Sequence, residues 1–370
     1  MMDQEQLKKL GRKNRRDAAI VILILAVSIP IAILLAIWLN PGYTREPFRE
    51  TRYALGDIPV TITAYGKDKG KVERAVREAF DEITRIDAMS NRFNPDSELS
   101  QMNQKAYEQP VPLSDDLWSM ISTSRDYYGL SQGTYDITLG SLSDVWGFGA
   151  NKRTVPPSPA EVAQARATTG MQHFILDPAA RTVRFDIPGL IVDLGGIAKG
   201  YAVNLAAEKL GEGGVVAALV DAISSSQTMG DKPGGENGWR IAVTNPRDPN
   251  AWLAEISVSG STTINTSGDF QQYYDYQGVR YHHILDPATG APARQSISVT
   301  ILGAQNSTQA EILTKAAFIL GYPRGMEVLQ QLGVNAIIVD STGAVHVSPG
   351  LQGTINLPTD HVPPEPPAGG

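Results

Sequence analysis

The sequence predicts an α+β protein with one folded body behind an N-terminal apolar segment. Its 370 residues are enough for a single large domain with an ample core. Hydrophobic residues make up 42% of the chain and charged residues 19%, which fits a globular body plus an additional apolar segment. Helical and strand-like patterns alternate irregularly, and several strand-like segments are adjacent, which favours α+β over a regular parallel sheet.

The N-terminal segment has the pattern of a membrane anchor. Residues 1–17 hold six basic and three acidic side chains, and residues 18–39 hold no charge. A helix rises about 1.5 Å per residue, so this apolar segment is long enough to cross a bilayer core of roughly 30 Å. A cleavable signal peptide is the alternative, but residues 37–41 lack a small-residue cleavage site. The basic flank predicts a single-pass inner-membrane protein whose body lies on the periplasmic side.

The rest of the chain excludes several classes of function. Beyond the first 17 residues there are 26 basic and 36 acidic side chains, so an acidic body argues against a nucleic-acid partner. The absence of cysteine excludes disulfides, Cys-ligated zinc and thiol nucleophiles. Residues 40–50 read as a polar linker, 51–357 as the folded body, and 358–370 as a Pro-rich, disordered tail.

Apolar periodicity predicts the elements of the body. Helices are expected at 71–89, 115–128, 197–210 and 307–320. Strands are expected at 187–194, 254–258, 279–285, 297–302 and 336–339. The third helix should stop at Gly211, and the fourth should be capped by Ser307 or Thr308. Residues 129–133 match a G-x-S-x-G nucleophile elbow, but a helix precedes them where the elbow requires a strand, so they do not predict a serine hydrolase.

One segment has the features of an anion site. An expected strand ends at Asp193, two glycines follow, and Lys199 lies in the first turn of the next helix. Free amides at a helix start, together with a nearby ammonium group, suit a phosphate. An ordinary strand-helix turn with a solvated Lys199 explains the pattern equally well.

A second segment concentrates proton-transfer groups. His282 and His283 are two of only five histidines, and they run into the turn formed by Asp286, Pro287 and Gly290. Taken alone, this segment reads as a strand that enters a turn.

Five motifs in order resemble the ApbE-like FAD:protein FMN transferases over roughly residues 53–339. They are Met89-Ser90 with 96–100, Thr134-Tyr135-Asp136 with 146–149, Asp193 with Lys199, 266–269, and 282–290. The resemblance implies a single α+β domain with FAD in a cleft. It also implies a reaction in which the FMN half of FAD is joined, with Mg²⁺, to a Ser or Thr of a partner protein through a phosphoester, releasing AMP. The implied partners are redox-complex subunits or other flavoproteins outside the cytoplasmic membrane.

The resemblance also assigns candidate site residues. His283 is the candidate catalytic residue, for proton handling or phosphate contact, since imidazole exchanges a proton near neutral pH. The implied FAD-binding residues are Met89, Thr134, Tyr135, Asp136, Asp193, Lys199, Ile284 and Asp286.

The implied metal site departs from the family pattern. The family combines a backbone carbonyl, matched by Gly196, with an Asp and a Thr four residues apart on a later helix. Glu311 and Lys315 stand at those two positions, and the candidate metal ligands are Gly196, Glu311 and Thr314. A protonated lysine cannot ligate Mg²⁺.

Two interpretations of this departure stay open. In one, Glu311 and Lys315 form an ordinary helical pair and the metal site is lost, which favours a catalytically impaired FAD-binding or scaffold homologue. In the other, the Lys315 ammonium takes the metal's place at the pyrophosphate. Both predict weak or absent Mg²⁺ binding.

A second departure lies at residues 219–227. The family usually has an Asn followed by two glycines here, whereas this chain has Ala222-Ile223 and three serines. The loss of both glycines removes backbone freedom near the expected cleft, and the serines offer replacement hydrogen bonds.

Overall fold

The computed structural model describes residues 26–32, 35, 46–234, 238–352, 355–358 and 362. The expected N-terminal segment 1–17, most of the anchor 18–39, most of the linker 40–50 and nearly all of the tail 358–370 lie outside these residues. Among the residues that are described, no helix is both long enough and apolar enough to cross a bilayer.

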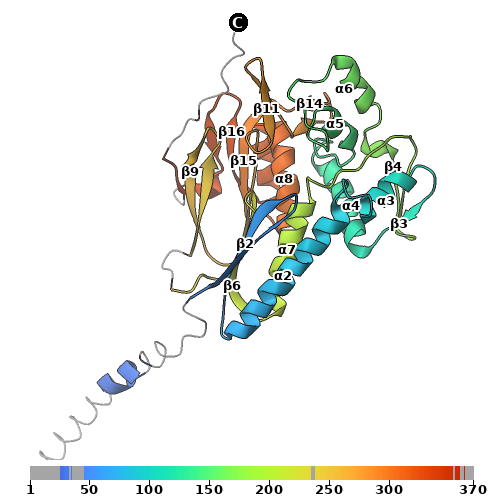
Figure 1. Ribbon diagram of the computed structural model, residues 1–370. Helices are drawn as coiled ribbons and strands as arrows, with labels where there is room; N and C mark the ends of the chain where they lie inside the picture. The colour runs from blue at the N-terminus through green and yellow to red at the C-terminus, as the bar shows by residue number, and fades with distance from the viewer. Residues whose placement is uncertain are drawn as a thin grey trace, which may run out of the picture.

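An eight-stranded sheet forms the centre of the molecule (Figure 1). Each pair of neighbouring strands is antiparallel, as expected for an α+β fold. The spatial order is β1 (Phe48–Ala54), β2 (Ile58–Gly66), β6 (Val215–Asp221), β7 (Ser225–Met229), β10 (Thr262–Gly268), β15 (Ser296–Leu302), β16 (Asn335–Asp340) and β17 (Val345–Val347). All seven residues of β15 are buried, because further layers cover both faces of the sheet there.

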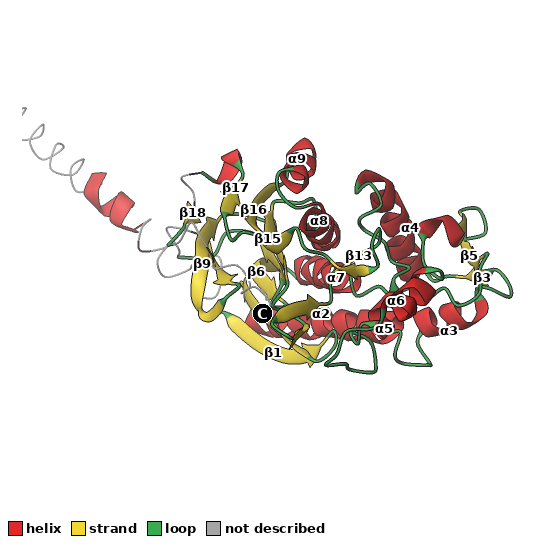
Figure 2. Cartoon of the chain, turned by 90° about the horizontal axis from the view of Figure 1, so that it is seen from above, coloured by secondary structure: helices red, strands yellow, loops and turns green. Residues whose placement is uncertain are grey.

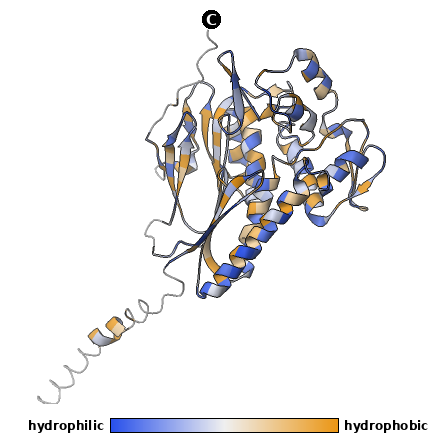
Figure 3. Ribbon diagram, in the orientation of Figure 1, coloured by the Kyte–Doolittle hydropathy of each residue, from blue (hydrophilic) through white to orange (hydrophobic). Residues whose placement is uncertain are grey.

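Helices cover one face of this sheet. They are α2 (Lys69–Ser90), α7 (Ala198–Glu212), α8 (Ser307–Leu320) and α9 (Arg324–Gln331). In α2 the side chains of Val72, Val76, Phe80 and Ile83 repeat at helical spacing and are buried against β2, β6 and α7. Figure 3 shows polar and apolar residues alternating along α2, as in an amphipathic helix.

Two helix boundaries differ from expectation. The side chain of Asn306, rather than Ser307 or Thr308, caps α8 and accepts a hydrogen bond from the N–H of Gln309 at 2.9 Å. An amide oxygen satisfies one of the free N–H groups there, which leaves both hydroxyl residues inside the buried first turn. Helix α7 passes through Gly211 to Glu212, since packing against α2 outweighs the low helix propensity of one glycine.

A three-stranded sheet packs on the opposite face. It consists of β8 (Trp239–Asn245), β9 (Asp248–Val258) and β18 (Ile355–Asn356), in the order β18-β9-β8. Val243 and Ile256 pack against Ile264, Ile337 and Val339 of the large sheet. The core therefore lies in two layers, one on each side of the central strands.

A second group of elements packs beyond the ends of α7 and α8 (Figure 2). It contains α3 (Glu98–Lys105), α4 (Asp115–Leu130), α5 (Gly140–Val145), α6 (Pro159–Arg166), β3 (Val111–Pro112), β4 (Phe174–Asp177) and β5 (Thr182–Phe185). Its apolar core continues into Leu194 and Ile197 before α7 and into Ile312 of α8. The segments that carry most candidate site residues thus meet where the two groups of elements join.

The expected strand at 187–194 is wrong. The segment forms a single bridge, between Ile191 and Leu139, and the regular strand is the earlier β5. The amide side chain of Asn103 bonds both the N–H and the C=O of Val192 at 2.9 Å, and the N–H of Asp193 donates to the Ile137 carbonyl. These partners satisfy the backbone without a strand ladder.

The histidine segment forms a small hairpin and a second short ribbon. Strands β11 (Tyr273–Tyr276) and β12 (Val279–His282) pair with each other, as do β13 (Leu285–Asp286) and β14 (Ala291–Pro292). The expected strand at 279–285 is therefore interrupted after His282. The backbone N–H of His283 donates to the Gln272 carbonyl instead of continuing a ladder.

Candidate functional site

A tight turn between Asp193 and α7 forms one side of the candidate site. The Asp193 carboxylate accepts a hydrogen bond from the N–H of Gly195 at 2.8 Å. A Cβ atom added to Gly196 would lie 3.3 Å from both Cδ of Lys315 and Cε2 of Tyr135. The lysine stem and the tyrosine ring therefore pack closely on the backbone of this turn, which a side chain at position 196 would push apart.

Two lysines converge on one carboxylate oxygen beside this turn. Nζ of Lys315 donates to Oε1 of Glu311 at 2.6 Å, and Nζ of Lys199 lies 3.2 Å from the same oxygen. Lys199 also donates to Oγ of Ser224 at 2.5 Å. Lys199 lies in the first turn of α7, whereas Glu311 and Lys315 lie one turn apart on α8, so the packing of these two helices creates the cluster.

Glu311 is buried yet ionised. Its side chain is only 4% exposed, and its second oxygen accepts from the Asn265 amide at 3.1 Å. Burial alone would raise the pKa of Glu311, but the charges of Lys199 and Lys315 outweigh it and hold that pKa below its usual value. The Asn265 amide also donates to Ser225, and its own oxygen Oδ1 is buried and has no hydrogen-bond partner in the part of the chain that the structure describes.

The donor atoms around Glu311 do not suit Mg²⁺. This ion requires about six oxygen ligands in near-octahedral geometry. Both carboxylate oxygens of Glu311 are already bonded to nitrogen donors. Thr314 does not join Gly196 and Glu311, because its hydroxyl donates to the Glu311 carbonyl and accepts from Ser267 on β10, each at 3.0 Å. In the described part of the chain, no group of three His, Asp or Glu side chains is placed to hold a metal ion.

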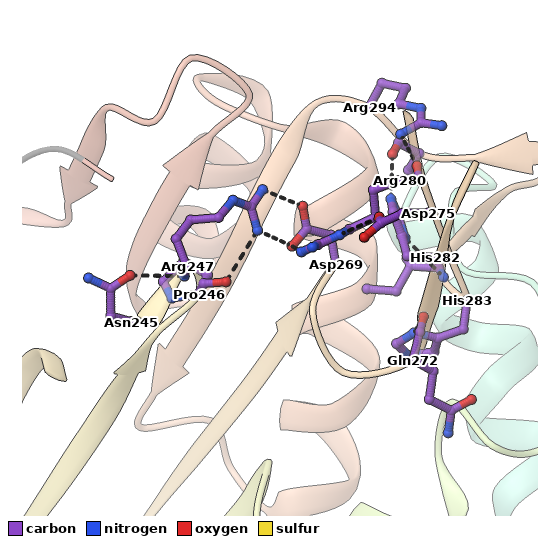
Figure 4. Close-up of polar contacts among 12 residues, drawn as sticks. Asn245, Pro246, Arg247, Asp269, Gln272, Asp275, Arg280, His282, His283 and Arg294 are labelled. Carbon is purple, nitrogen blue, oxygen red and sulfur yellow. Dashed lines mark hydrogen bonds and ion pairs between the residues drawn. The ribbon is translucent and has the colours of Figure 1, made fainter. Parts of the chain in front are cut away.

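The two adjacent histidines have different environments (Figure 4). His282 uses both ring nitrogens, because Nε2 donates to the Ala293 carbonyl at 2.8 Å and Nδ1 accepts from the Ile284 N–H at 3.3 Å. Nδ1 of His283 lies 3.3 Å from the Gln272 carbonyl. A carbonyl only accepts, so Nδ1 carries the proton in neutral His283 and Nε2 remains an acceptor.

Burial favours the neutral form of both imidazole rings, because it lowers the pKa of each. Burial lowers the pKa of His282 to about 4. Burial lowers the pKa of His283 to about 3, and His282, Lys315 and Lys199 add to the effect. The charges of Lys315 and Lys199 therefore reach His283, whose ring contacts are with Gln272 and Phe148.

A buried ion-pair network holds the hairpin that carries the histidines (Figure 4). Arg247 makes two contacts of 2.7 Å with the Asp269 carboxylate, and Arg280 of β12 lies 3.8 Å from the same carboxylate. The guanidinium of Arg280 covers the ring of Tyr273 at 3.8 Å, and Arg294 donates to the Arg280 carbonyl at 2.6 Å. Asp269, the last residue of the 266–269 motif, thus positions the β11-β12 hairpin.

Aromatic rings form a row beside His283. Trp146 stacks on Tyr281, Tyr281 on Tyr274, and Tyr274 on Phe148, with centroid separations of 5.6, 5.5 and 5.9 Å. Phe148 meets the edge of His283 at 6.4 Å. The Tyr274 hydroxyl is buried and has no hydrogen-bond partner among the described residues. This row joins the 146–149 motif to the histidine hairpin.

The turn after the histidines is tied to the same row. Nε1 of Trp146 donates to the Gly290 carbonyl at 2.7 Å. Asp286 accepts from the N–H of Ala288 at 2.9 Å, so its carboxylate stabilises the turn itself. Ile284 is buried in the core between α8 and the large sheet.

The other predicted FAD-binding residues lie on elements next to this site. Met89, at the end of α2, is half-buried between the two helix-side cores. Thr134 donates to the Ser131 carbonyl at 2.8 Å. Asp136 accepts from both the N–H and the hydroxyl of Thr138, and burial raises the pKa of its carboxyl.

The structure thus separates the predicted residues into two sets. In the first set, Lys199 and Glu311 form the lysine cluster with Lys315, and Gly196 and Tyr135 lie beside the Lys315 stem. Asp193 belongs to the same turn as Gly196, and the charges of the two lysines reach His283. Those that hold the surrounding loops or packing are Met89, Thr134, Asp136, Ile284, Asp286 and Thr314.

Arg92 is a site residue that sequence reasoning missed. Its guanidinium donates to Asp193 at 2.7 Å and to both oxygens of Asp144 at 2.7 and 3.2 Å, and its side chain is 7% exposed. Arg92 thereby links the turn before α7 to α5. The sequence feature that could have identified Arg92 is its position two residues after the Met89-Ser90 motif.

The glycine-free turn between β6 and β7 supplies Ser224. Ile223 adopts φ +61, a left-handed conformation that β-branched residues rarely take. This conformation brings the hydroxyl of Ser224 to Lys199, while the carbonyl of Ser224 accepts from the N–H of Thr266 at 2.8 Å. The turn therefore keeps a glycine-like backbone without the glycines.

Taken together, the fold and the site define an α+β protein built to bind an anionic, aromatic-containing ligand. The ammonium group of Lys199, at the start of α7, and that of Lys315, on α8, share one carboxylate oxygen. A neutral imidazole offers an acceptor nitrogen, and a row of aromatic rings lies beside it. These are the groups that a nucleotide-dependent transferase requires.

Comparison with known proteins agrees with this class. A family model described as the ApbE family matches residues 57–338, and the chain belongs to this family. It is similar to the FAD:protein FMN transferase of Vibrio cholerae, at 32% identity over 74% of this chain and 79% of the relative. It is also similar to the FAD:protein FMN transferase of Escherichia coli K12, at 30% identity over 70% of this chain and 74% of the relative.

Solved structures show the same fold. The ApbE protein from Thermotoga maritima superposes with a TM-score of 0.75 at 29% identity, covering 84% of this chain and 99% of that one. The flavin transferase ApbE from Vibrio cholerae gives a TM-score of 0.73 at 28% identity, covering 83% and 98%.

Proposed function

We propose that this protein is an FAD:protein FMN transferase, which joins the FMN half of FAD to a Ser or Thr hydroxyl of a partner protein and releases AMP. The observation that carries the proposal is the pairing of two ammonium groups, from Lys199 and Lys315, on one oxygen of the buried Glu311 beside the turn that starts α7. The names of the curated relatives support the same reaction.

The chemistry assigns roles to the residues of the cluster. The acceptor hydroxyl attacks the phosphorus of the FMN half, a new P–O bond forms, and the P–O bond to AMP breaks. Nε2 of His283 accepts the hydroxyl proton, since Nδ1 is held by the Gln272 carbonyl. Negative charge grows on the departing AMP phosphate, where Lys199 and Lys315 stabilise it.

The proposed location is the outer face of the inner membrane. The uncharged segment 18–39 and its basic flank support a single-pass anchor with a periplasmic body. The acceptor is accordingly a redox-complex subunit or a flavoprotein domain with an exposed Ser or Thr on the same side of the membrane.

Incubation with FAD and a target domain that carries an acceptor Thr, followed by intact-mass spectrometry, tests the proposal. We expect the target mass to increase by one FMN phosphoester. An acceptor Thr→Ala target is the control, and we expect its mass to stay unchanged. FAD bound without any mass change would contradict transferase activity and indicate a flavin-binding scaffold.

A further inference from the structure

Ammonium groups surround Glu311 at the place where a metal ion would require oxygen ligands. Two ammonium groups, from Lys199 and Lys315, share one oxygen of a buried carboxylate. Two positive charges against one negative charge leave the group with an excess of one positive charge. A buried excess charge is costly unless another charged group approaches it, so the cluster favours an anion.

We propose that Lys199 and Lys315 together bind the diphosphate of FAD in place of a metal ion, so that FMN transfer by this protein is metal-independent. The inference rests on the proposed function for its substrate. It adds that the side chains of Lys199 and Lys315, and not a metal ion, stabilise the negative charge on the phosphates during the reaction.

The position of the Lys315 stem supports a contact with phosphate. Its Cδ would lie 3.3 Å from a Cβ on Gly196, so the stem runs along the turn that leads into α7. The free N–H groups of a helix start and a lysine ammonium both favour phosphate oxygens. Lys199 is fixed from the other side by Ser224 at 2.5 Å. Glu311 holds the two ammonium groups together and limits their mutual repulsion.

The step balances without a metal. The hydroxyl oxygen of the acceptor forms a bond to the FMN phosphorus, the bond from that phosphorus to the bridging oxygen breaks, and AMP leaves with that oxygen. The hydroxyl proton passes to Nε2 of His283. No electron is transferred, and no further reactant is needed.

The first test compares FMN transfer in EDTA with transfer in Mg²⁺, using the full chain. We expect the wild-type transfer rate and FAD affinity to agree within about twofold under the two conditions. Isothermal titration with Mg²⁺ alone should show no binding at micromolar concentrations. A transfer rate that falls more than tenfold in EDTA would overturn the inference while leaving the proposed function intact.

Lys315→Thr is the decisive variant, because it removes the ammonium group and introduces an oxygen ligand beside Glu311. In EDTA we expect its FAD affinity to fall roughly ten- to a hundredfold, as for the loss of a charged hydrogen bond. Mg²⁺ should restore part of that loss, and such a gain also shows that the variant is folded. FAD affinity in EDTA equal to wild type would overturn the inference.

Lys209→Thr is the matched control. Lys209 lies on α7 like Lys199, but it pairs with Glu212 near the surface at 2.8 Å. We expect this variant to bind FAD as the wild type does in EDTA. Lys199→Met repeats the test from the other lysine if Lys315→Thr does not fold.

Riboflavin binding separates failure of the inference from failure of the proposed function. Riboflavin lacks the diphosphate, so Lys315→Thr should weaken FAD binding and leave riboflavin binding within about twofold. If no FMN transfer occurs in either EDTA or Mg²⁺, the proposed function fails, and this binding comparison still decides the inference. Equal losses for FAD and riboflavin would contradict a diphosphate contact.

Discussion

Nδ1 of His283 lies 3.3 Å from the carbonyl oxygen of Gln272, and this contact decides which of two adjacent histidines can accept a proton. In neutral His283, Nε2 keeps its lone pair and has no hydrogen-bond partner among residues whose positions the structure describes. His282 has no such nitrogen, because both of its nitrogens are bonded within the fold. We therefore expect substitution of His283 to affect the rate of FMN transfer and substitution of His282 to affect stability.

His283→Gln should slow FMN transfer by about a hundred- to ten-thousandfold, as for the loss of a general base. The FAD affinity should change only a few-fold, because the substitution leaves Lys199 and Lys315 in place. Single-turnover rates and FAD titration measure the two quantities. His173→Gln, at the partly exposed pair with Asp186, is the control. A transfer rate within threefold of wild type would exclude His283 as the base.

His282 should act on stability and on its pH dependence. Its pKa of about 4 in the fold lies below the ordinary value of 6.5, so the unfolded chain binds the proton first as the pH falls. The stabilisation is present above about pH 6.5 and is lost as the pH falls towards 4. The loss is about 3 kcal/mol for this one group.

Urea unfolding of wild type and His282→Gln at pH 7 and pH 4 checks this prediction. The difference between the two pH values should be smaller in the variant. Equal differences in the two proteins would show that His282 is not buried in its neutral form.

Arg92→Met should reduce both stability and FAD binding. The substitution removes charged hydrogen bonds to Asp193 and Asp144 and should lower the free energy of unfolding by about 2 kcal/mol. Arg85→Met is the control, because the side chain of Arg85 is 48% exposed in its pairs with Glu82 and Asp116. Such surface pairs contribute less than about 1 kcal/mol. Equal losses for the two variants would argue against a linking role for Arg92.

Ile223→Gly should stabilise the protein, although glycine usually destabilises a strand end. Ile223 has φ +61 and is 62% exposed, so the substitution relieves backbone strain and removes little packing. We expect the free energy of unfolding to rise by about 1 kcal/mol. Val216→Gly, in the regular strand β6, should lower it by about the same amount. A decrease for both variants would show that Ile223 is not strained.

Sequence reasoning predicted the elements whose patterns are local. The helix at 71–89 and the strand at 297–302 appear as α2 and β15 with nearly the expected bounds, because their apolar repeats match the layers that bury them. The predicted strand at 187–194 failed because Asn103, some ninety residues earlier in the chain, bonds the backbone of Val192. No local pattern carries that information.

The candidate site shows the same division. Motif order grouped Asp193, Lys199 and His283, and of these Lys199 forms part of the lysine cluster while Asp193 lies in the turn that precedes α7. The placement of the Lys315 ammonium at the pyrophosphate stays a prediction. The sharing of a Glu311 oxygen by Lys315 and Lys199 depends on how α7 packs against α8. That contact joins residues more than a hundred positions apart in the chain.

The amount of AMP released for each covalent FMN is the most direct test of FMN transfer from FAD to a partner protein. Quantitative chromatography of AMP and intact-mass measurement of the acceptor, in the same time course, give both numbers. We expect one AMP for each flavinylated acceptor, and we expect His283→Gln to lower the amounts of both products together. AMP release without labelling of the acceptor would mean FAD hydrolysis, and it would contradict the transferase assignment.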